Sequence, residues 1–247
     1  MPVFQTEVVS ESDVLIVSFS GLLGRFIPFE FSKTTQTLSY NRIHVRDPYK
    51  LFYLAGVDEN GFDHLRERLR AEMSRFNVKK VIFIGASSGG FAALLFGHLL
   101  GADCIHAFAP RIHLQLTKMV AEGDYKSVLN RLLTVWKLHR RLSVEHRQFL
   151  DLKPLLNSDK PRTTRTYLHA CASCIDAVRV RYVHDCPNTR LFFYPCSEHN
   201  VAKVLVQSNY IQAMLQRQNL DAPEKIYRKF YGNFDQPSFH SPIPAGG

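Results

Sequence analysis

The sequence predicts an α/β protein with a single domain over residues 1–247, in which a mostly parallel sheet carries helices on both faces. Short apolar runs that suit buried strands alternate with segments of helical periodicity over most of the chain. After the fourth expected strand, a stretch of about fifty residues shows helical periodicity only, which predicts a helical cap inserted at 111–162. The length is sufficient for one sizeable hydrophobic core.

The first two expected strands and the first helix have clear boundaries. The apolar run 13–19 ends at a Ser-Gly pair, and the alternating run 41–46 stops at an Asp-Pro pair. Between them and the next strand, apolar residues in 62–76 recur at spacings of three and four, which is typical of an amphipathic helix.

The middle of the chain predicts two strands around an apolar helix. The run 80–84 reads as a buried strand that stops at Gly85, and 104–108 reads as another that is closed by a proline. Between them, 91–100 is apolar nearly all round and is followed by a glycine, so we expect a buried helix there.

The last third returns to alternating strands and helices. Strands are expected at 166–169 and 190–194, and helices at 175–183 and 201–214. The segment 221–247 is rich in Pro, Gly and aromatic residues without a clear period, so we expect an irregular C-terminal tail.

The composition is that of an ordinary globular protein, with 45% hydrophobic and 21% charged residues. No apolar run approaches the ~18 residues of a membrane span, and the N-terminus does not resemble a secretory signal. Five cysteines are an odd and low count, which argues against a disulfide framework and favours a reducing, cytoplasmic compartment.

The positive charge is concentrated in the expected cap. The chain has a net charge of +9, and the segment 111–166 holds 12 Lys and Arg against 5 Asp and Glu, a net charge of +7. Such a segment is either a solvated helical surface or a face toward an anionic partner. If the apolar side of the cap faces the core, the charges face outward or lie over the active site; that apolar side would comprise Leu132, Val135, Leu138 and Leu142.

The most informative motif is Gly85-Ala86-Ser87-Ser88-Gly89, a G-x-S-x-G pattern directly between an apolar strand and an apolar helix. This is the context of a nucleophile elbow, where small neighbours allow a strained turn to expose the serine. A dinucleotide site would need G-x-G-x-x-G, and a phosphate-binding loop would need Gly-Lys-Ser/Thr, and neither is present. Ser87 is therefore the expected nucleophile, and Ser88 is the alternative if the motif is read one position later.

The expected general base is His199, which follows the strand 190–194 and precedes a helix. Catalytic groups of such a sheet gather where strands end at their carboxyl edge. His169 ends the preceding strand and is the second candidate, whereas His184 precedes a strand and lies at the wrong edge.

The expected orienting acid is Asp176, because the order along the chain should be serine, acid, histidine. Asp185 lies at the wrong end of a strand, and Asp151 in the cap is the next candidate. The oxyanion hole should use the backbone N–H of Ser88 and one from the turn after the first strand, at Gly21 and Leu22.

These motifs resemble those of the α/β-hydrolase superfamily over roughly residues 13–215, and more narrowly a group of small bacterial α/β-hydrolases found with polysaccharide-related genes. The resemblance rests on Phe19-Ser20-Gly21, Ser87-Ser88-Gly89-Gly90-Phe91-Ala92-Ala93, Phe96-Gly97, Phe108-Ala109-Pro110, Asp176 and His199. Where that group usually has a Trp-Tyr pair, this chain has Phe52-Tyr53, which affects the substrate pocket rather than the triad.

The resemblance implies a serine esterase that cleaves carboxylic esters through an acyl-enzyme, without a metal or organic cofactor. The substrate would be a small-molecule or saccharide ester, anionic if the basic cap faces it. An acyltransferase with the same Ser-His-Asp triad is a close variant. A non-catalytic module that binds a polyanion through 111–165 is the alternative from another class.

Two further patterns carry less weight. Cys171 and Cys174 form a C-x-x-C motif, but without a second pair it predicts small packing thiols rather than zinc. The basic cap matches no recognisable nucleic-acid module, so nucleic acid is not an expected partner.

Overall fold

A computed structural model describes residues 2–9, 11–21, 29–158, 164–196 and 199–232. Within these ranges, seven strands form one sheet in the order β1-β3-β2-β4-β5-β6-β7. All neighbouring strands pair in parallel except β1, which pairs antiparallel with β3 at the sheet edge. The strands are β1 (Phe4–Glu7), β2 (Val14–Phe19), β3 (Asn41–Val45), β4 (Lys80–Ala86), β5 (Cys104–Phe108), β6 (Arg165–Cys171) and β7 (Thr189–Tyr194).

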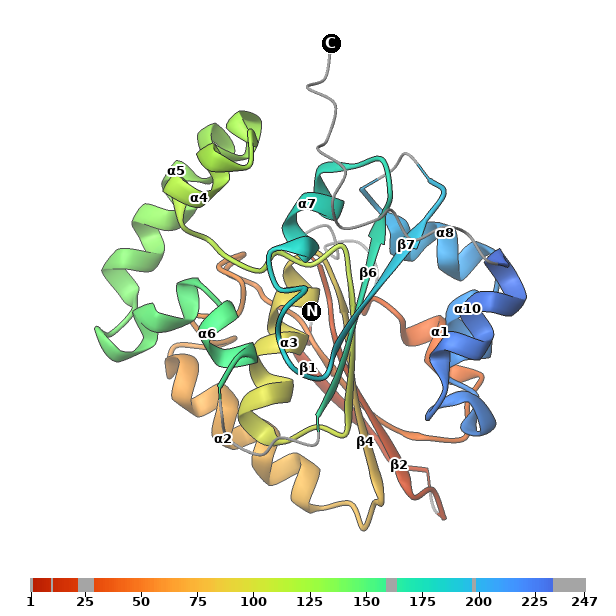
Figure 1. Ribbon diagram of the computed structural model, residues 1–247. Helices are drawn as coiled ribbons and strands as arrows, with labels where there is room; N and C mark the ends of the chain where they lie inside the picture. Colours follow the sequence, from red (N-terminus) through yellow and green to blue (C-terminus); the bar gives the residue numbers. More distant parts are fainter. Residues whose placement is uncertain (1, 10, 22–28, 159–163, 197–198, 233–247) are drawn as a thin grey trace.

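Helices cover both faces of this sheet (Figure 1). One face carries α2, α3 and the cap helices, and the other carries α1, α8 and α10. The α-helices are α1 (Ser32–Gln36), α2 (Gly61–Ser74), α3 (Ser88–Leu100), α4 (Leu116–Ala121), α5 (Tyr125–Arg141), α6 (Lys153–Leu156), α7 (Ile175–Arg181), α8 (Val201–Gln207), α9 (Tyr210–Met214) and α10 (Pro223–Tyr231). Short 3-10 helices span Glu145–Leu150 and Arg217–Asn219.

The two faces have separate hydrophobic cores, and β2 contributes to both. Leu15, Val17 and Phe19 belong to the core under α2 and α3, whereas Val14 and Ile16 belong to the core under α8 to α10. This alternation follows from the two-residue period of a strand. Because both faces are covered, all six residues of β2 are buried, which explains its continuous apolar run.

The helical cap is inserted between β5 and β6, as expected. The chain segments that enter and leave it pair with each other, since the Leu114 N–H donates to the Leu150 carbonyl at 2.7 Å and the Leu152 N–H donates to the Ile112 carbonyl at 2.9 Å. Leu138 is fully buried on the core side of α5, but Leu132, expected on the same side, is 47% exposed.

Three local features differ from the sequence-based expectations. The edge strand β1 was not expected, because four partly exposed residues show little pattern. The single helix expected over 201–214 is two helices, since Asn209 adopts a left-handed φ of 57° between α8 and α9. The expected irregular tail is wrong for α10, which buries Ile226 and Tyr227 against the sheet. Residues 233–247 lie outside the described part.

Candidate active site

Ser87 occupies the turn between β4 and α3 and is the N-terminal flanking residue of that helix. Its backbone has φ 53° and ψ −114°, a conformation that costs a non-glycine residue energy. The turn is held in place because the Ser87 N–H donates to the Phe108 carbonyl of β5 at 2.8 Å, and the Phe91 N–H donates to the Ser87 carbonyl at 3.1 Å. Ser87 is partly exposed. This strained turn between a strand and a helix is the geometry of a nucleophile elbow.

The glycines around Ser87 allow three pieces of backbone to touch. A Cβ added to Gly85 would lie 2.1 Å from the Gly89 carbonyl oxygen, and a Cβ added to Gly89 would lie 2.1 Å from the Phe19 carbonyl oxygen. The start of α3 therefore packs directly against β4 and against the end of β2, with no room for side chains.

Ser88, the competing serine, is fully buried. Its Oγ has no hydrogen-bond partner within the described ranges and is inaccessible to a substrate. Its backbone N–H belongs to the first turn of α3, where N–H groups lack partners within the helix. These positions favour Ser87 as the reacting serine and Ser88 as a backbone donor.

Asp176 and His199 are in direct contact. His199 Nδ1 lies 2.6 Å from Asp176 Oδ2; the aspartate is fully buried in the first turn of α7, and the His199 side chain is 53% exposed. Ser87, Asp176 and His199 follow β4, β6 and β7, so all three lie at the carboxyl edge of the parallel sheet. No hydrogen bond joins Ser87 to His199 in the part of the chain that is described. Such contacts are often long before a substrate binds.

The alternative histidines have other environments. His169 is fully buried, with Nδ1 2.7 Å from the Tyr194 hydroxyl and Nε2 3.1 Å from His106 Nδ1. Burial holds the pKa of His169 well below its usual value, so it is a neutral core residue. His184 is exposed and contacts the backbone carbonyl of Arg181.

The alternative acids pair with lysines. Asp185 forms a 2.8 Å ion pair with Lys153. Asp151 accepts hydrogen bonds from Lys118 and, at 3.0 Å, from the Tyr182 hydroxyl. Of the three aspartates that the sequence suggested, only Asp176 contacts His199.

A buried network that sequence analysis did not reveal links Asp176 to the cap. Arg179 donates to Asp176 Oδ1 and to Asp124 Oδ2, and Arg111 donates to Asp124 Oδ2 at 3.0 Å. Asp124 lies between α4 and α5, and Asp124, Arg111 and Arg179 are each at most 8% exposed. The carboxylate that contacts His199 is therefore also tied to the cap. Asp124 and Arg179 are 55 positions apart, so no local pattern could reveal the pairing.

The predicted oxyanion donor Gly21 has an unexpected partner. Its N–H donates to Glu30 Oε2 at 2.6 Å, and the Glu30 N–H donates to Ser20 Oγ at 3.1 Å. Burial raises the pKa of Glu30. The Gly21 N–H is therefore already bonded to the Glu30 carboxyl group, which an oxyanion would have to displace. Leu22, the other donor expected there, lies outside the described residues.

The C-x-x-C motif helps to join two loops. The Cys171 thiol and the Ser173 hydroxyl, the latter at 2.8 Å, both donate to the carbonyl oxygen of Cys196. This ties the loop before Asp176 to the loop before His199. Within the described ranges, no group of three or more His, Cys, Asp or Glu side chains is arranged to hold a metal ion.

The chain resembles known proteins in structure rather than in sequence. A scan against protein-family models finds no match, and a search of curated proteins finds none either. Solved structures do match, and they establish that this chain has the α/β-hydrolase fold. None of the helices in the described ranges is both long and apolar enough to span a bilayer.

Three solved structures illustrate the likeness. The capsule O-acetyltransferase of Neisseria meningitidis serogroup A has 13% identity and a TM-score of 0.63, over 86% of this chain and 90% of that chain. MenH from S. aureus has 14% identity and a TM-score of 0.57, over 91% and 100%. The α/β hydrolase MGS-MChE2, from the metagenome of Mar Chica lagoon sediments in Morocco, has 15% identity and a TM-score of 0.52, over 85% and 92%.

Proposed function

We propose that this protein is a serine esterase that cleaves carboxylic esters with Ser87, His199 and Asp176. Ser87 Oγ attacks the ester carbonyl while His199 takes the serine proton, and His199 returns that proton to the leaving alcohol as the acyl-enzyme forms. Water then attacks the acyl-enzyme while His199 takes the water proton. His199 returns this proton to Ser87 Oγ as the acid leaves. The observation that carries the proposal is the contact of His199 with the buried Asp176, at the sheet edge where the strained Ser87 lies.

The backbone would supply the oxyanion hole. The Ser88 N–H and an N–H of the turn at Gly21 and Leu22 would stabilise the negative oxygen of the tetrahedral intermediate. The contact between Gly89 and Phe19 supports this pairing, because it brings the first turn of α3 against the end of β2.

The same acyl-enzyme can pass its acyl group to an alcohol instead of water. The likeness to a capsule O-acetyltransferase supports this variant, with a saccharide hydroxyl as acceptor. The substrate class that we propose is an acylated sugar or small ester, anionic if the basic cap contributes to binding. Adding a saccharide acceptor to the ester assay separates the two variants, since an acyltransferase would form the acylated sugar in place of free acid.

A non-catalytic polyanion-binding module is the competing function and rests on the charge of the cap. The contact between His199 and the buried Asp176 argues against it, because binding alone does not need an oriented imidazole. The five cysteines, all free thiols, support a reducing compartment such as the cytoplasm.

Covalent labelling tests the proposal. We expect a fluorophosphonate to label the wild-type protein on the peptide that contains Ser87, and short-chain p-nitrophenyl esters to be hydrolysed. Ser87→Ala should abolish labelling and lower kcat by about 10³-fold or more. Ser88→Ala is the matched control, since it should remain labelled. A label on Ser88, or no label and no turnover by the wild type, would refute the proposal.

A further inference from the structure

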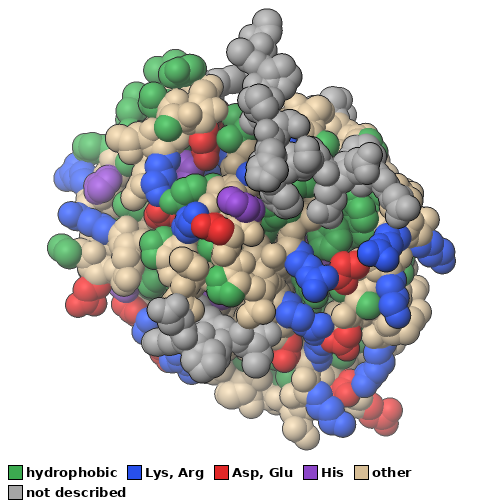
Figure 2. All heavy atoms as spheres, in the orientation of Figure 1, with side chains coloured by type: hydrophobic (Ala, Val, Ile, Leu, Met, Phe, Trp, Pro, Cys, Tyr) green, Lys and Arg blue, Asp and Glu red, His purple; other side chains and the backbone are tan. Residues whose placement is uncertain are grey.

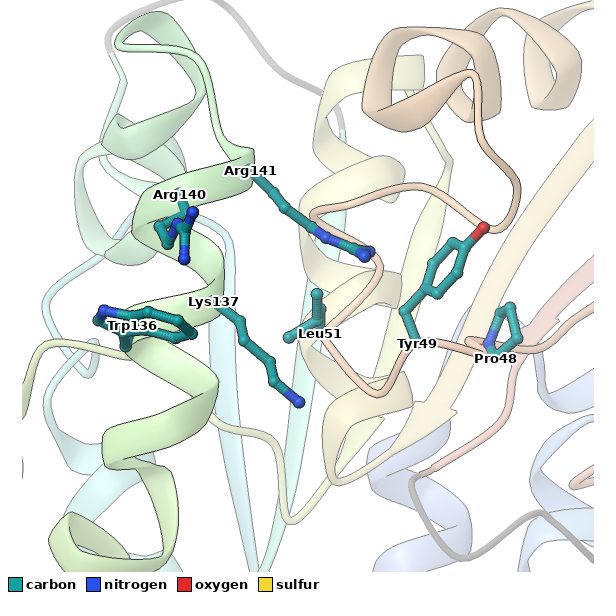
Figure 3. Close-up of a pocket in the computed structure, with 7 residues that line it drawn as sticks. All are labelled: Pro48, Tyr49, Leu51, Trp136, Lys137, Arg140 and Arg141. Atoms are coloured by element: carbon teal, nitrogen blue, oxygen red, sulfur yellow. The ribbon is translucent and has the colours of Figure 1, made fainter.

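A groove of about 600 Å³ lies between the cap and the loop that follows β3. The loop contributes Pro48, Tyr49 and Leu51, and the C-terminal end of α5 contributes the opposite wall, with Trp136, Lys137, Arg140 and Arg141. Figure 3 shows Lys137 and Arg141 extending from α5 across the groove toward the loop. The volume is within the range of sites that bind small molecules.

The groove has a concentrated positive charge. Lys137, Arg140 and Arg141 line it, and within the described ranges none of the three forms an ion pair with a carboxylate. The two arginines stack on aromatic rings instead, Arg140 at 4.8 Å from the centre of Trp136 and Arg141 at 5.1 Å from that of Tyr49. Figure 2 shows hydrophobic and basic side chains side by side over the cap.

An adjoining cavity of about 390 Å³ has a different charge. It shares Tyr49 and Arg141 with the groove but also contains Asp58 and Glu59. Arg141 therefore lies between a groove lined by basic side chains and a cavity that also contains acidic ones.

Hydrogen bonds and ring contacts hold the loop that forms one wall of the groove. Asp47 accepts backbone hydrogen bonds from Tyr49 at 2.9 Å and from Tyr53 at 3.0 Å, which shapes the loop. The guanidinium of Arg131 lies 4.7 Å from the ring centre of Phe52 in the same loop, which joins the loop to α5. Phe52 also packs edge-on against Phe91, in the first turn of the helix that follows Ser87. The loop that forms one wall of the groove thus packs on the helix that carries the proposed nucleophile.

We propose that this groove binds an oxyanion-bearing saccharide segment of the substrate. The inference rests on the proposed function and gives it a substrate class. Guanidinium groups pair well with carboxylate and phosphate oxygens. Trp136 and Tyr49, which are 53% and 38% exposed, offer ring faces against which the C–H bonds of a sugar can pack. The three cations lie within five residues of α5 rather than along an extended groove, which favours a short glycan over a nucleic-acid strand.

Tryptophan fluorescence tests the proposal directly, because Trp136 is the only tryptophan of the chain. We would titrate the Ser87→Ala variant with hyaluronan tetrasaccharide, glucose 1-phosphate, inorganic phosphate, maltotetraose and a single-stranded DNA oligomer. We expect a saturable change with hyaluronan tetrasaccharide or glucose 1-phosphate, and the tighter of these identifies the preferred oxyanion. Inorganic phosphate and neutral maltotetraose should each bind at least about tenfold more weakly, because phosphate has no sugar ring and maltotetraose has no negative charge.

Paired charge variants separate the groove from general electrostatics. Lys137→Gln with Arg140→Gln should weaken binding of the anionic sugar by about tenfold or more in calorimetry. Lys225→Gln with Lys229→Gln removes the same charge from exposed positions on α10, across the sheet (Figure 1), and should change the affinity less than twofold. Equal losses in both pairs, equal binding of maltotetraose, or tighter binding of DNA would overturn the proposal. Fluorophosphonate labelling of Ser87 in the charge variants tests catalysis separately from the groove.

Discussion

Replacing Asp124 by Asn tests whether the network between the cap and Asp176 stabilises the fold. The change keeps the shape of the side chain but removes the negative charge that Arg111 and Arg179 share. Both arginines are nearly fully buried, at 6% and 4% exposure. In Asp124→Asn, Arg111 loses its ion pair at 3.0 Å, and Arg179 keeps its ion pair with Asp176 but loses the one with Asp124. Removing one partner of a buried ion pair costs about 3–5 kcal/mol.

We expect a cost of about 3 kcal/mol, because the amide oxygen of Asn can still accept one hydrogen bond. For a domain of this size, each kcal/mol lowers Tm by about 2–4 °C, so Asp124→Asn should lower Tm by about 6–12 °C. Thermal unfolding followed by circular dichroism measures the shift.

Asp221→Asn is the matched control. Asp221 also pairs with two cations, Lys80 and Arg165, but its side chain is 72% exposed. Exposed ion pairs contribute less than about 1 kcal/mol, so its Tm should fall far less. If the two variants lower Tm equally, or if Asp124→Asn lowers it by less than about 2 °C, the buried ion pairs of Asp124 do not stabilise the fold more than exposed ones do.

Three other predictions concern the site and the core. Asp176→Asn should keep the fold, although it also loses the ion pair with Arg179, and should lower kcat by ~10²–10⁴, because His199 loses its orienting charge; a nearly unchanged kcat would assign the acid elsewhere. Glu30→Gln should tighten inhibition by a boronate analogue of the tetrahedral intermediate, since a neutral amide competes less for the Gly21 N–H; an unchanged inhibition constant would show that this N–H does not hold the oxyanion. Burial lowers the pKa of His44 from 6.5 to about 4. Between these pH values the unfolded chain binds a proton at His44 and the folded chain does not, so the free energy of unfolding decreases as the pH falls. In urea unfolding, His44 should contribute about 3 kcal/mol to the stability lost between pH 7 and pH 4, so the loss in His44→Gln should be smaller by about that amount; equal losses in both proteins would contradict this origin.

The sequence predicted what local patterns encode. The run 80–84, the small residues after it and the apolar helix that follows predicted the turn at Ser87, because each of these features depends on near neighbours. The placement of Asp176 and His199 came from a rule about sheet edges, and the contact between them agrees with it.

What the sequence did not predict depends on distant partners. Nothing in the sequence around Asp124 distinguishes it from other loop residues, because its partner Arg179 is 55 positions away. Glu30 gives no sign that its carboxylate contacts Gly21, because that contact depends on how the chain folds back after β2. The helix α10 is a different case, because its own nine residues are amphipathic, with Pro223 at the start and Ile226 and Tyr227 on the buried side. It was missed because the Pro, Gly and aromatic residues of 221–247 together suggested one irregular tail.

The contact between α3 and β2 has a consequence for how this protein can evolve. At Gly89, even a methyl group would overlap the Phe19 carbonyl oxygen, so substitution requires the helix or the strand to move. Such a movement would separate the Ser88 N–H from the turn at Gly21. A random library selected only for folded, soluble protein should therefore tolerate changes at Leu129 and Leu133, which are more than 70% exposed, and exclude them at Gly89. Distant relatives of this chain would be easier to recognise by that glycine than by the surface of the cap.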